Sequence, residues 1–196
     1  MGKPCTKEKI LLKGARFIHE KGYNNTGLQE ILGAAGVPKG SFYFYFKNKE
    51  DFGLQAMDTY AAFIRHISEK FLCDVTLPPL SRLERFFDYY LLHFENMDLR
   101  YGCPIGNLMQ EMSDLSEPFR KKICSIYDDI CSLIQQCIVD AQQTGCIPEN
   151  IDAVAAAQYI FDSWEGAVMH MKMAKSTRPL INYKKILFST LLKHPD

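Results

Sequence analysis

The segment from Thr26 to Asp51 constrains the fold more than any other part of the sequence, because it contains two short helical patterns joined by a glycine. Apolar residues recur at three- and four-residue steps before Gly36, which predicts a short helix that packs one side against a core. Gly36 stands where the chain must turn sharply and tolerates a positive φ. Pro38 suits the first turn of a second helix, expected to run to about Tyr45.

The second helix of this pair carries five consecutive aromatic residues, 42–46, with lysines before and after them. One reading is a purely hydrophobic core run. Five adjacent side chains cannot all face inward on one helix, however, so at least two must be exposed. Exposed aromatic and basic side chains suit a major groove and its phosphate walls. The segment therefore predicts a helix-turn-helix that binds DNA.

Different chemistry is expected of the residues that face the DNA. Serine and lysine can meet base edges, tyrosine hydroxyls and Lys49 can meet phosphates, and Gly40 lets the helix backbone approach the DNA closely. Thr26 is expected to cap the first of the two helices and to add one phosphate contact. The predicted DNA-binding residues are Thr26, Lys39, Gly40, Ser41, Tyr43, Tyr45 and Lys49.

The run from Gly36 to Asp51, GVPKGSFYFYFKNKED, resembles the signature of the TetR family of bacterial transcriptional regulators. The resemblance implies a homodimer that represses transcription from a palindromic DNA operator and is released by a small-molecule effector. It also implies that the two C-terminal helices pair with those of a second subunit. Gly27 departs from the family pattern, which often has Thr or Ser there.

Apolar residues recur at helical spacing almost throughout the chain, and no segment alternates as a strand would. This predicts an all-α fold of about nine helices: a three-helix DNA-binding head, residues 1–49, and a larger effector-binding and dimerisation body, residues 50–196. A linking helix is expected over 50–71. The remaining body helices are predicted at 80–96, 104–112, 117–144, 152–174 and 182–193, the last two forming the dimer interface.

Charge is distributed unevenly between these two parts. The chain has a formal net charge of +0, but residues 1–49 hold nine Lys or Arg against three Glu, so the head carries +6 and the rest −6. Positive charge is thus concentrated where the DNA motif lies. We expect DNA binding to weaken steeply with salt.

The cysteines favour a reducing compartment. Seven are scattered along the chain without a Cys-x-x-Cys pair or metal-ligand spacing, so neither disulfides nor a metal site is expected. No leader and no apolar run long enough to span a bilayer is found. The expected location is the cytoplasm, with no membrane partner and no cofactor.

A second motif lies in the body, at Tyr101–Leu108, with Trp164–Ala167 following much later. Both are similar to the NemR/AcuR-like subgroup of the TetR family, which senses electrophiles and oxidants. The resemblance implies that Cys103 is a reactive thiol and that Lys172, or with less support Lys175, forms a covalent link to it on oxidation.

The residues around Cys103 give this implication a physical basis. Cys103 directly precedes an expected helix start at Pro104, where unpaired amides and the helix dipole favour a thiolate. The alternative is that Cys103 is a small residue that packs the helix start, as most non-disulfide cysteines do. The sequence leaves both open.

An effector pocket is expected among the middle helices of the body, since the family binds its ligands there. Its candidate lining is aromatic and Met-rich, which is also the composition of an ordinary core. The candidate pocket residues are Phe86, Tyr90, His93, Met109, Tyr127, Trp164 and Met169. Lone histidines give no reason to expect a metal there.

Two further functions compete with an effector-controlled repressor. A DNA-binding regulator with an architectural role or a protein partner, and no small-molecule effector, would carry the same head. A cysteine-dependent enzyme is disfavoured, because no general base accompanies the thiol in the sequence.

Overall fold

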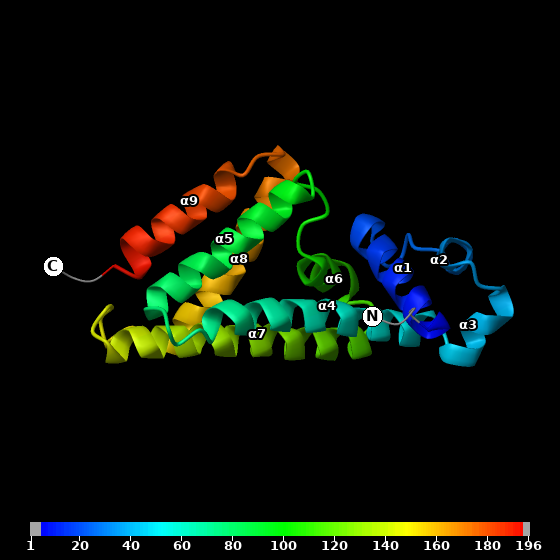
Figure 1. The fold of residues 1–196 in the computed structure, drawn as a ribbon, viewed down its shortest axis with the longest axis horizontal. Coiled ribbons are helices and arrows are strands. Elements are labelled where there is room, and N and C mark those ends of the chain that lie inside the picture. The colour runs from blue at the N-terminus through cyan, green and yellow to red at the C-terminus, as the bar shows by residue number, and fades with distance from the viewer. Residues whose placement is uncertain (1–4, 194–196) are drawn as a thin grey trace. The chain divides into compact units, whose positions relative to one another are not determined.

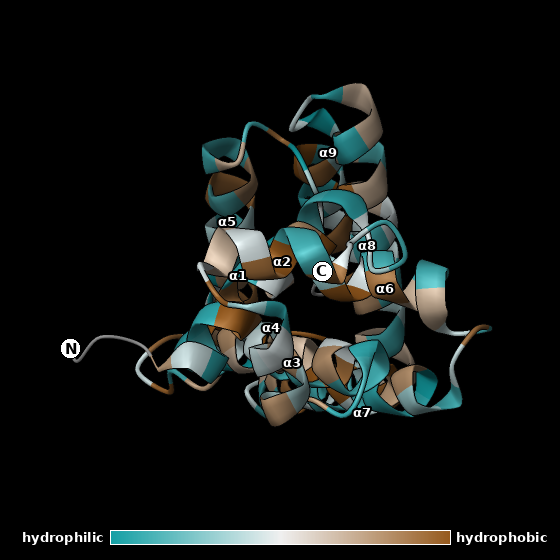
Figure 2. Ribbon diagram, turned by 90° about the vertical axis from the view of Figure 1, so that its right-hand side faces the viewer, coloured by the Kyte–Doolittle hydropathy of each residue, from teal (hydrophilic) through white to brown (hydrophobic). Residues whose placement is uncertain are grey.

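A computed structural model describes residues 5–193 and contains nine α-helices and one π-helical turn, with no strand in that stretch (Figure 1). The predicted all-α fold of about nine helices is therefore confirmed. Hydrophobic and hydrophilic residues are interspersed along the helices, as in helices that bury one side (Figure 2). The elements are α1 (Thr6–Lys21), α2 (Leu28–Ala35), α3 (Lys39–Tyr45), α4 (Lys49–Leu72), α5 (Pro79–Asn96), α6 (Pro104–Met112), α7 (Glu117–Gln143), α8 (Ala153–Ala174), α9 (Arg178–Ile186) and η1 (Leu187–Leu191).

The chain forms two compact units, each built from two separate segments. The first unit contains the described residues up to Phe63 together with Cys103–Ser125, and the second contains Ile64–Gly102 and the described residues from Ile126 onward. Helices α4 and α7 therefore each contribute to both units. The head, residues 1–49, lies within the first unit, and its independence as a domain stays a prediction.

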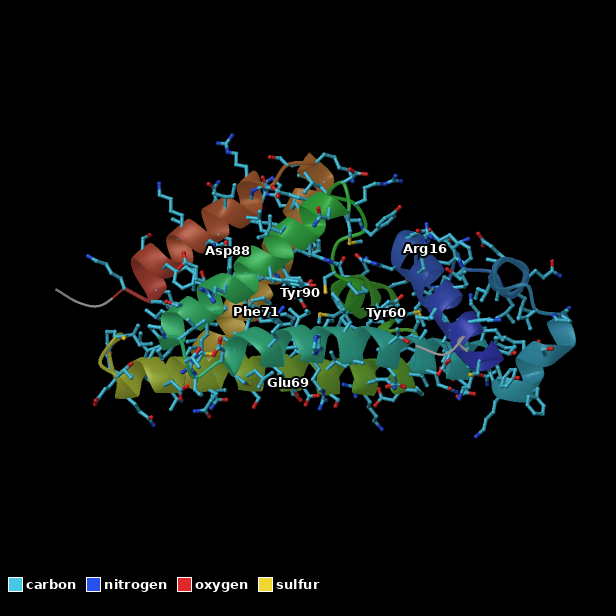
Figure 3. The ribbon with its side chains drawn as sticks, viewed as in Figure 1. Arg16, Tyr60, Glu69, Phe71, Asp88 and Tyr90 are labelled. Carbon is cyan, nitrogen blue, oxygen red and sulfur yellow. The ribbon has the colours of Figure 1, made fainter. Side chains whose placement is uncertain are left out.

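In the first unit, the helices of the head pack against α4. Phe42 of α3 and Phe52 of α4 are fully buried, with ring centroids 5.8 Å apart. Gly14 lets α1 approach this core, because a Cβ at Gly14 would lie 2.1 Å from Cζ of Phe52. Tyr60 of α4, labelled in Figure 3, donates its hydroxyl hydrogen to the carbonyl of Ala15 on α1. These contacts hold α1 and α3 against α4.

In the second unit, α5, α8 and α9 lie side by side (Figure 1) and meet in an aromatic cluster. The ring centroid of Phe87 lies 4.7 Å from that of Trp164 and 5.3 Å from that of Tyr183. The Tyr183 hydroxyl donates a 2.7 Å hydrogen bond to the carbonyl of Ile160. Burial raises the pKa of Tyr183 far above its ordinary value, so this hydroxyl stays a donor.

The predicted helix over 182–193 is wrong in its bounds. Helix α9 begins at Arg178, with Pro179 in its first turn. Proline is tolerated there because first-turn amides have no acceptor within the helix. The chain then passes into the π-helical turn η1, so the α-helix itself ends at Ile186.

Candidate nucleic-acid interface and sensor site

The turn between α2 and α3 is closed around Gly36. Gly36 adopts the left-handed conformation, with φ 66° and ψ 35°. The amide of Val37 donates to the carbonyl of Leu32 at 3.0 Å, which ends α2 in a sharp turn. Pro38 then stands at the N-cap of α3, so the second helix begins one residue later than predicted. The expected helix-turn-helix geometry is present.

Helix α3 has an inner and an outer side. Phe42 and Phe46 are buried, and the Phe46 ring centroid lies 5.2 Å from that of Phe52 on α4. Tyr43 and Phe44 are instead 60% and 83% exposed. The prediction that at least two aromatic residues of the run are exposed is confirmed. The inner aromatic pair anchors the helix and leaves its outer side available for a partner.

Most of the predicted contact residues lie on this one helix. Lys39, Gly40 and Tyr43 are exposed, and Ser41 and Tyr45 are partly exposed. A Cβ added at Gly40 would meet no atom within 4 Å, so neighbouring protein atoms do not require glycine there. The structure therefore brings these residues together on α3, and their contacts with DNA stay predictions.

Thr26 does not cap α2. Its side chain is fully buried, and its hydroxyl donates to the carbonyl of Gly22 at 2.6 Å. The N-cap of α2 is Gly27, without a side-chain hydrogen bond. The predicted cap is wrong because the end of α1 leaves a carbonyl without a helical donor, and the Thr26 hydroxyl serves it. Its burial also leaves Thr26 outside the exposed surface on which a phosphate could bind.

Lys49 lies half-buried at the start of α4. Its Nζ lies 4.5 Å from the centroid of the Tyr23 ring and 3.4 Å from the carbonyl oxygen of Asn24, to which it donates. Burial lowers the pKa of the Lys49 ammonium, and the negative charge of Glu111 opposes that shift. The ammonium is thus held against the loop between α1 and α2. Its predicted role at a phosphate stays a prediction.

Glu111 of α6 binds that same loop. Its carboxylate oxygens accept hydrogen bonds from the backbone amides of Tyr23 and Asn24, each at 2.8 Å. Gly22 precedes these amides with φ 90°, and a Cβ there would lie 2.9 Å from Oε2 of Glu111. Burial, followed by the charges of Glu50 and Glu111, raises the pKa of Tyr23 to about 12. Charge-assisted hydrogen bonds therefore fix α6 to the head.

Cys103 occupies the N-cap of α6, at the helix start that the sequence predicts. Its Sγ accepts a hydrogen bond from the backbone amide of Gly106 at 3.4 Å, and Pro104 fills the first turn. The side chain is partly exposed. Amides at a helix start stabilise a thiolate. This arrangement gives the thiol a suitable environment, and its reactivity stays a prediction.

Lys172 and Lys175 lie at the end of α8, in the second unit. Lys172 is exposed. Lys175 caps α8 in the left-handed conformation with φ 49°, and its Nζ donates to the carbonyl of Leu99 at 3.2 Å. Cys103 belongs to the first unit. The covalent link between the thiol and a lysine stays a prediction.

Four of the predicted pocket residues, Phe86, Tyr127, Trp164 and Met169, have different surroundings. Phe86 of α5 and Trp164 are buried in the core of the second unit, whereas Met169 is 50% exposed. The Tyr127 hydroxyl donates to Oδ1 of Asp162 at 2.9 Å.

The other predicted pocket residues lie on α5 and α6. Tyr90, labelled in Figure 3, continues an aromatic series along α5, with its ring centroid 5.1 Å from that of Phe86 and 6.2 Å from that of His93. Burial lowers the pKa of His93. Met109 lies on α6 and belongs to the first unit. An effector pocket made by these residues stays a prediction.

A groove with a volume of about 1110 Å³ runs along α8 and α9 in the second unit. None of the seven predicted pocket residues lines it. Its α8 wall is made mainly of small side chains, and its α9 wall is bulkier. The lining includes Ser163, Gly166, Ala167 and Ala174 on α8, Tyr183 and Ile186 on α9, and Leu187 at the start of η1.

Two of the remaining thiols, Cys131 and Cys137, are buried. Burial raises the pKa of Cys131 to about 11 and that of Cys137 to about 12.

Among residues 5–193, no group of three or more His, Cys, Asp or Glu could hold a metal ion. Within the same range, no helix is long and apolar enough to cross a bilayer.

The site residues predicted from the sequence do not include exposed Phe44, exposed Lys47 or Glu111, whose carboxylate binds the loop between α1 and α2. Phe44 could have been found, because it lies about 200° around the helix from buried Phe42. Exposed Lys47 directly follows the aromatic run, which is also a local signal. Glu111 gives no such signal, since its partners are 87 and 88 residues earlier in the chain.

Two family profiles match the sequence. The profile of bacterial regulatory proteins of the tetR family covers residues 10–55, which include α2, the turn and α3. The profile of the tetracyclin repressor-like C-terminal domain covers residues 79–187. The matches therefore include both the helix-turn-helix and most of the body.

Similar proteins match over nearly the whole chain. The HTH-type transcriptional repressor DhaR of Mycobacterium sp. (strain GP1) is 32% identical over 192 residues, covering 98% of this chain and 95% of DhaR. The transcriptional regulator AcuR of Cereibacter sphaeroides is 34% identical over 178 residues, covering 91% of this chain and 81% of AcuR. The crystal structure of reduced Escherichia coli NemR has a TM-score of 0.84 at 27% identity, covering 98% of this chain and 100% of that one.

These relatives are transcriptional regulators rather than enzymes. Their agreement with the two profiles, and with the glycine turn and exposed α3 described above, assigns the protein: the chain belongs to the tetR family of bacterial regulatory proteins.

Proposed function

We propose that this chain is a homodimeric transcriptional repressor that binds a palindromic operator through α3 and is released by a small molecule or by modification of Cys103. The observation that carries the proposal is the two-sided character of α3. Phe42 and Phe46 hold the helix to its base, while Lys39 and Tyr43 lie exposed on a head of net charge +6. Such a surface suits a major groove lined by phosphates.

The groove along α8 and α9 supports the dimer. Gly166, Ala167 and Ala174 leave little side-chain volume on its α8 wall, which permits another helix to approach closely. Tyr159 at the rim is 61% exposed and offers area to a partner. The occupant we propose is the same pair of helices from a second subunit. Two heads related by a two-fold axis would then read half-sites about 34 Å apart, one turn of DNA.

The contacts of α6 support a route from Cys103 to the head. Cys103 caps the N-terminus of α6, and Glu111, near the other end of this nine-residue helix, binds the amides of Tyr23 and Asn24. An electrophilic alkene would add its carbon to Sγ, and the thiol proton would pass to the neighbouring carbon. The added group removes the Sγ acceptor from the Gly106 amide and displaces the start of α6. That displacement would alter the pose of the head and separate the two α3 helices from successive grooves.

A gel shift with the DNA upstream of this gene tests release by modification. Wild type, Cys103→Ser and Cys124→Ser are each compared with and without N-ethylmaleimide. Cys124 is a suitable control because it is an exposed thiol of the same unit. We expect the reagent to release wild type and Cys124→Ser but not Cys103→Ser. If Cys103→Ser is released equally, modification of Cys103 is not the signal.

Dimerisation is tested separately with Gly166→Arg. A Cβ at Gly166 would meet no atom within 4 Å in its own subunit, so we expect the substitution to leave the monomer fold intact while its side chain fills the groove. Light scattering after size-exclusion chromatography should show a dimer for wild type and a monomer for Gly166→Arg. The control is Gly33→Arg, at an equally open position on α2. A dimeric Gly166→Arg would exclude this groove as the interface. The cytoplasm is the location this function requires.

A further inference from the structure

We propose that Phe44 selects a thymine in each operator half-site by contact with the thymine 5-methyl group. The proposal rests on the proposed DNA-binding function and adds a base-reading residue to it. Among the large hydrophobic side chains of residues 5–193, Phe44 is the most exposed, at 83%. A single exposed apolar side chain is ordinary on a protein surface. Its position on α3 is what makes this one informative.

Phe44 lies on the side of α3 opposite its anchor. It is about 200° around the helix from Phe42, which is fully buried. Its ring centroid lies 4.9 Å from that of Tyr45, in an edge-to-face arrangement at 89°. The Tyr45 ring therefore steadies the Phe44 ring without covering it. The Phe44 ring is available to a surface that approaches α3 from outside.

Gly40 shares this outward side, because it precedes Phe44 by four residues on the same helix. Gly40 has no side chain and has open space where a Cβ would be. The α3 backbone can therefore approach a groove floor at Gly40 while the Phe44 ring covers adjacent base edges.

The chemistry of the ring determines which base it favours. A phenyl ring neither donates nor accepts a conventional hydrogen bond, so it cannot read the polar groups on a base edge. The thymine 5-methyl group is the apolar group that the major groove displays, and phenylalanine is among the side chains that contact it. Lys39 and Lys47, both exposed, flank the ring in the sequence and can bind phosphates on either side. The ring would thus be desolvated against a methyl group, with charge placed around it.

The test begins with a binding site selected from random duplex DNA by the wild-type protein. Each thymine of that site is then replaced in turn by deoxyuridine, which removes only the 5-methyl group. Affinities are measured by fluorescence anisotropy for wild type, Phe44→Ala and the control Val75→Ala. Val75 is comparably exposed, at 78%, and lies outside the head. Circular dichroism verifies that each variant is folded, as the exposure of both side chains leads us to expect.

We expect one thymine per half-site whose replacement weakens wild type and Val75→Ala about fourfold, the fold-change for one buried methyl group. Phe44→Ala should bind the unmodified site more weakly and be indifferent to deoxyuridine at that position alone. If Phe44→Ala shows the same deoxyuridine profile as wild type, Phe44 does not read the methyl group. Selection of no consensus by wild type would instead overturn sequence-specific binding itself, so the two failures are distinguishable.

Discussion

The carboxylate of Glu111 on α6 accepts a hydrogen bond from the backbone amide of Tyr23 at 2.8 Å, and the next amide, that of Asn24, binds the other carboxylate oxygen at the same distance. These two amides follow α1, where the chain turns toward α2. One carboxylate can satisfy both amides, because it accepts through two oxygens. These two hydrogen bonds connect the head to α6, the helix whose N-terminus Cys103 caps.

Replacement of Glu111 should therefore loosen this attachment. Glu111→Ala removes both acceptors, and we expect the free energy of unfolding to fall by about 2 kcal/mol, the order for hydrogen bonds to a charged group. Urea denaturation measures the change. Glu117→Ala is the control, because Glu117 forms exposed ion pairs with Arg120 and Lys121, and solvent-exposed pairs contribute little to stability. Equal losses in the two variants would contradict a special role for Glu111.

Alanine substitutions at Gly40 and Gly33 test whether the α3 backbone approaches DNA. Gly40→Ala and Gly33→Ala each place a methyl group in open space on an exposed helix surface, so each should maintain the stability or raise it by up to about 1 kcal/mol. Only Gly40→Ala should weaken DNA binding, because Gly40 lies on α3. Thermal unfolding and fluorescence anisotropy measure the two effects. Unchanged DNA affinity in Gly40→Ala would show that the backbone there does not approach DNA.

The thiols should differ in their rates of alkylation. Cys131 and Cys137 are buried, and their raised pKa values of about 11 and about 12 keep them protonated at pH 7.5. Limited treatment with iodoacetamide, read by mass spectrometry of peptides, should label Cys103 before the exposed Cys124 and leave the buried pair unmodified. Labelling of all four at similar rates would indicate unfolding or a Cys103 thiol without enhanced reactivity.

His93 should make the stability depend on pH. Burial lowers its pKa in the folded protein below the ordinary value of 6.5, so the unfolded chain binds a proton more readily than the folded one. The free energy of unfolding should therefore decrease as the pH falls below about 6.5, and level off once the folded form is protonated as well. Urea titrations between pH 5 and pH 8 measure this slope.

The variant His93→Gln should lose that part of the slope. The exposed His66 on α4 provides the control, and His66→Gln should retain the wild-type pH dependence. A slope that survives in His93→Gln would assign the effect to other groups.

Local signals in the sequence predicted the helix-turn-helix well. Gly36 requires a left-handed turn, and the alternation of buried Phe42 with exposed Tyr43 follows from helical geometry alone. Predictions that depend on one or two neighbouring turns were therefore reliable.

Contacts between distant parts of the chain could not be predicted in this way. The buried Arg82 pairs with Asp140, which is 58 residues later, and nothing near either residue in the sequence indicates the other. Thr26 shows the same limit at short range. Its type and position suit a helix cap, but the carbonyl of Gly22 binds the hydroxyl instead. The conformation of the folded loop decides which group binds the Thr26 hydroxyl. Local sequence preference alone therefore assigned the wrong role to Thr26.

The discontinuous make-up of the two compact units has a consequence for how regulators of this kind can be recombined. The unit that contains α1, α2 and α3 also takes in Cys103–Ser125, which the chain reaches only after traversing Ile64–Gly102. A single crossover in the gene would therefore transplant a head without the carboxylate that holds its loop. A functional hybrid of two such proteins needs a double exchange, in which α6 is inherited together with the head it supports.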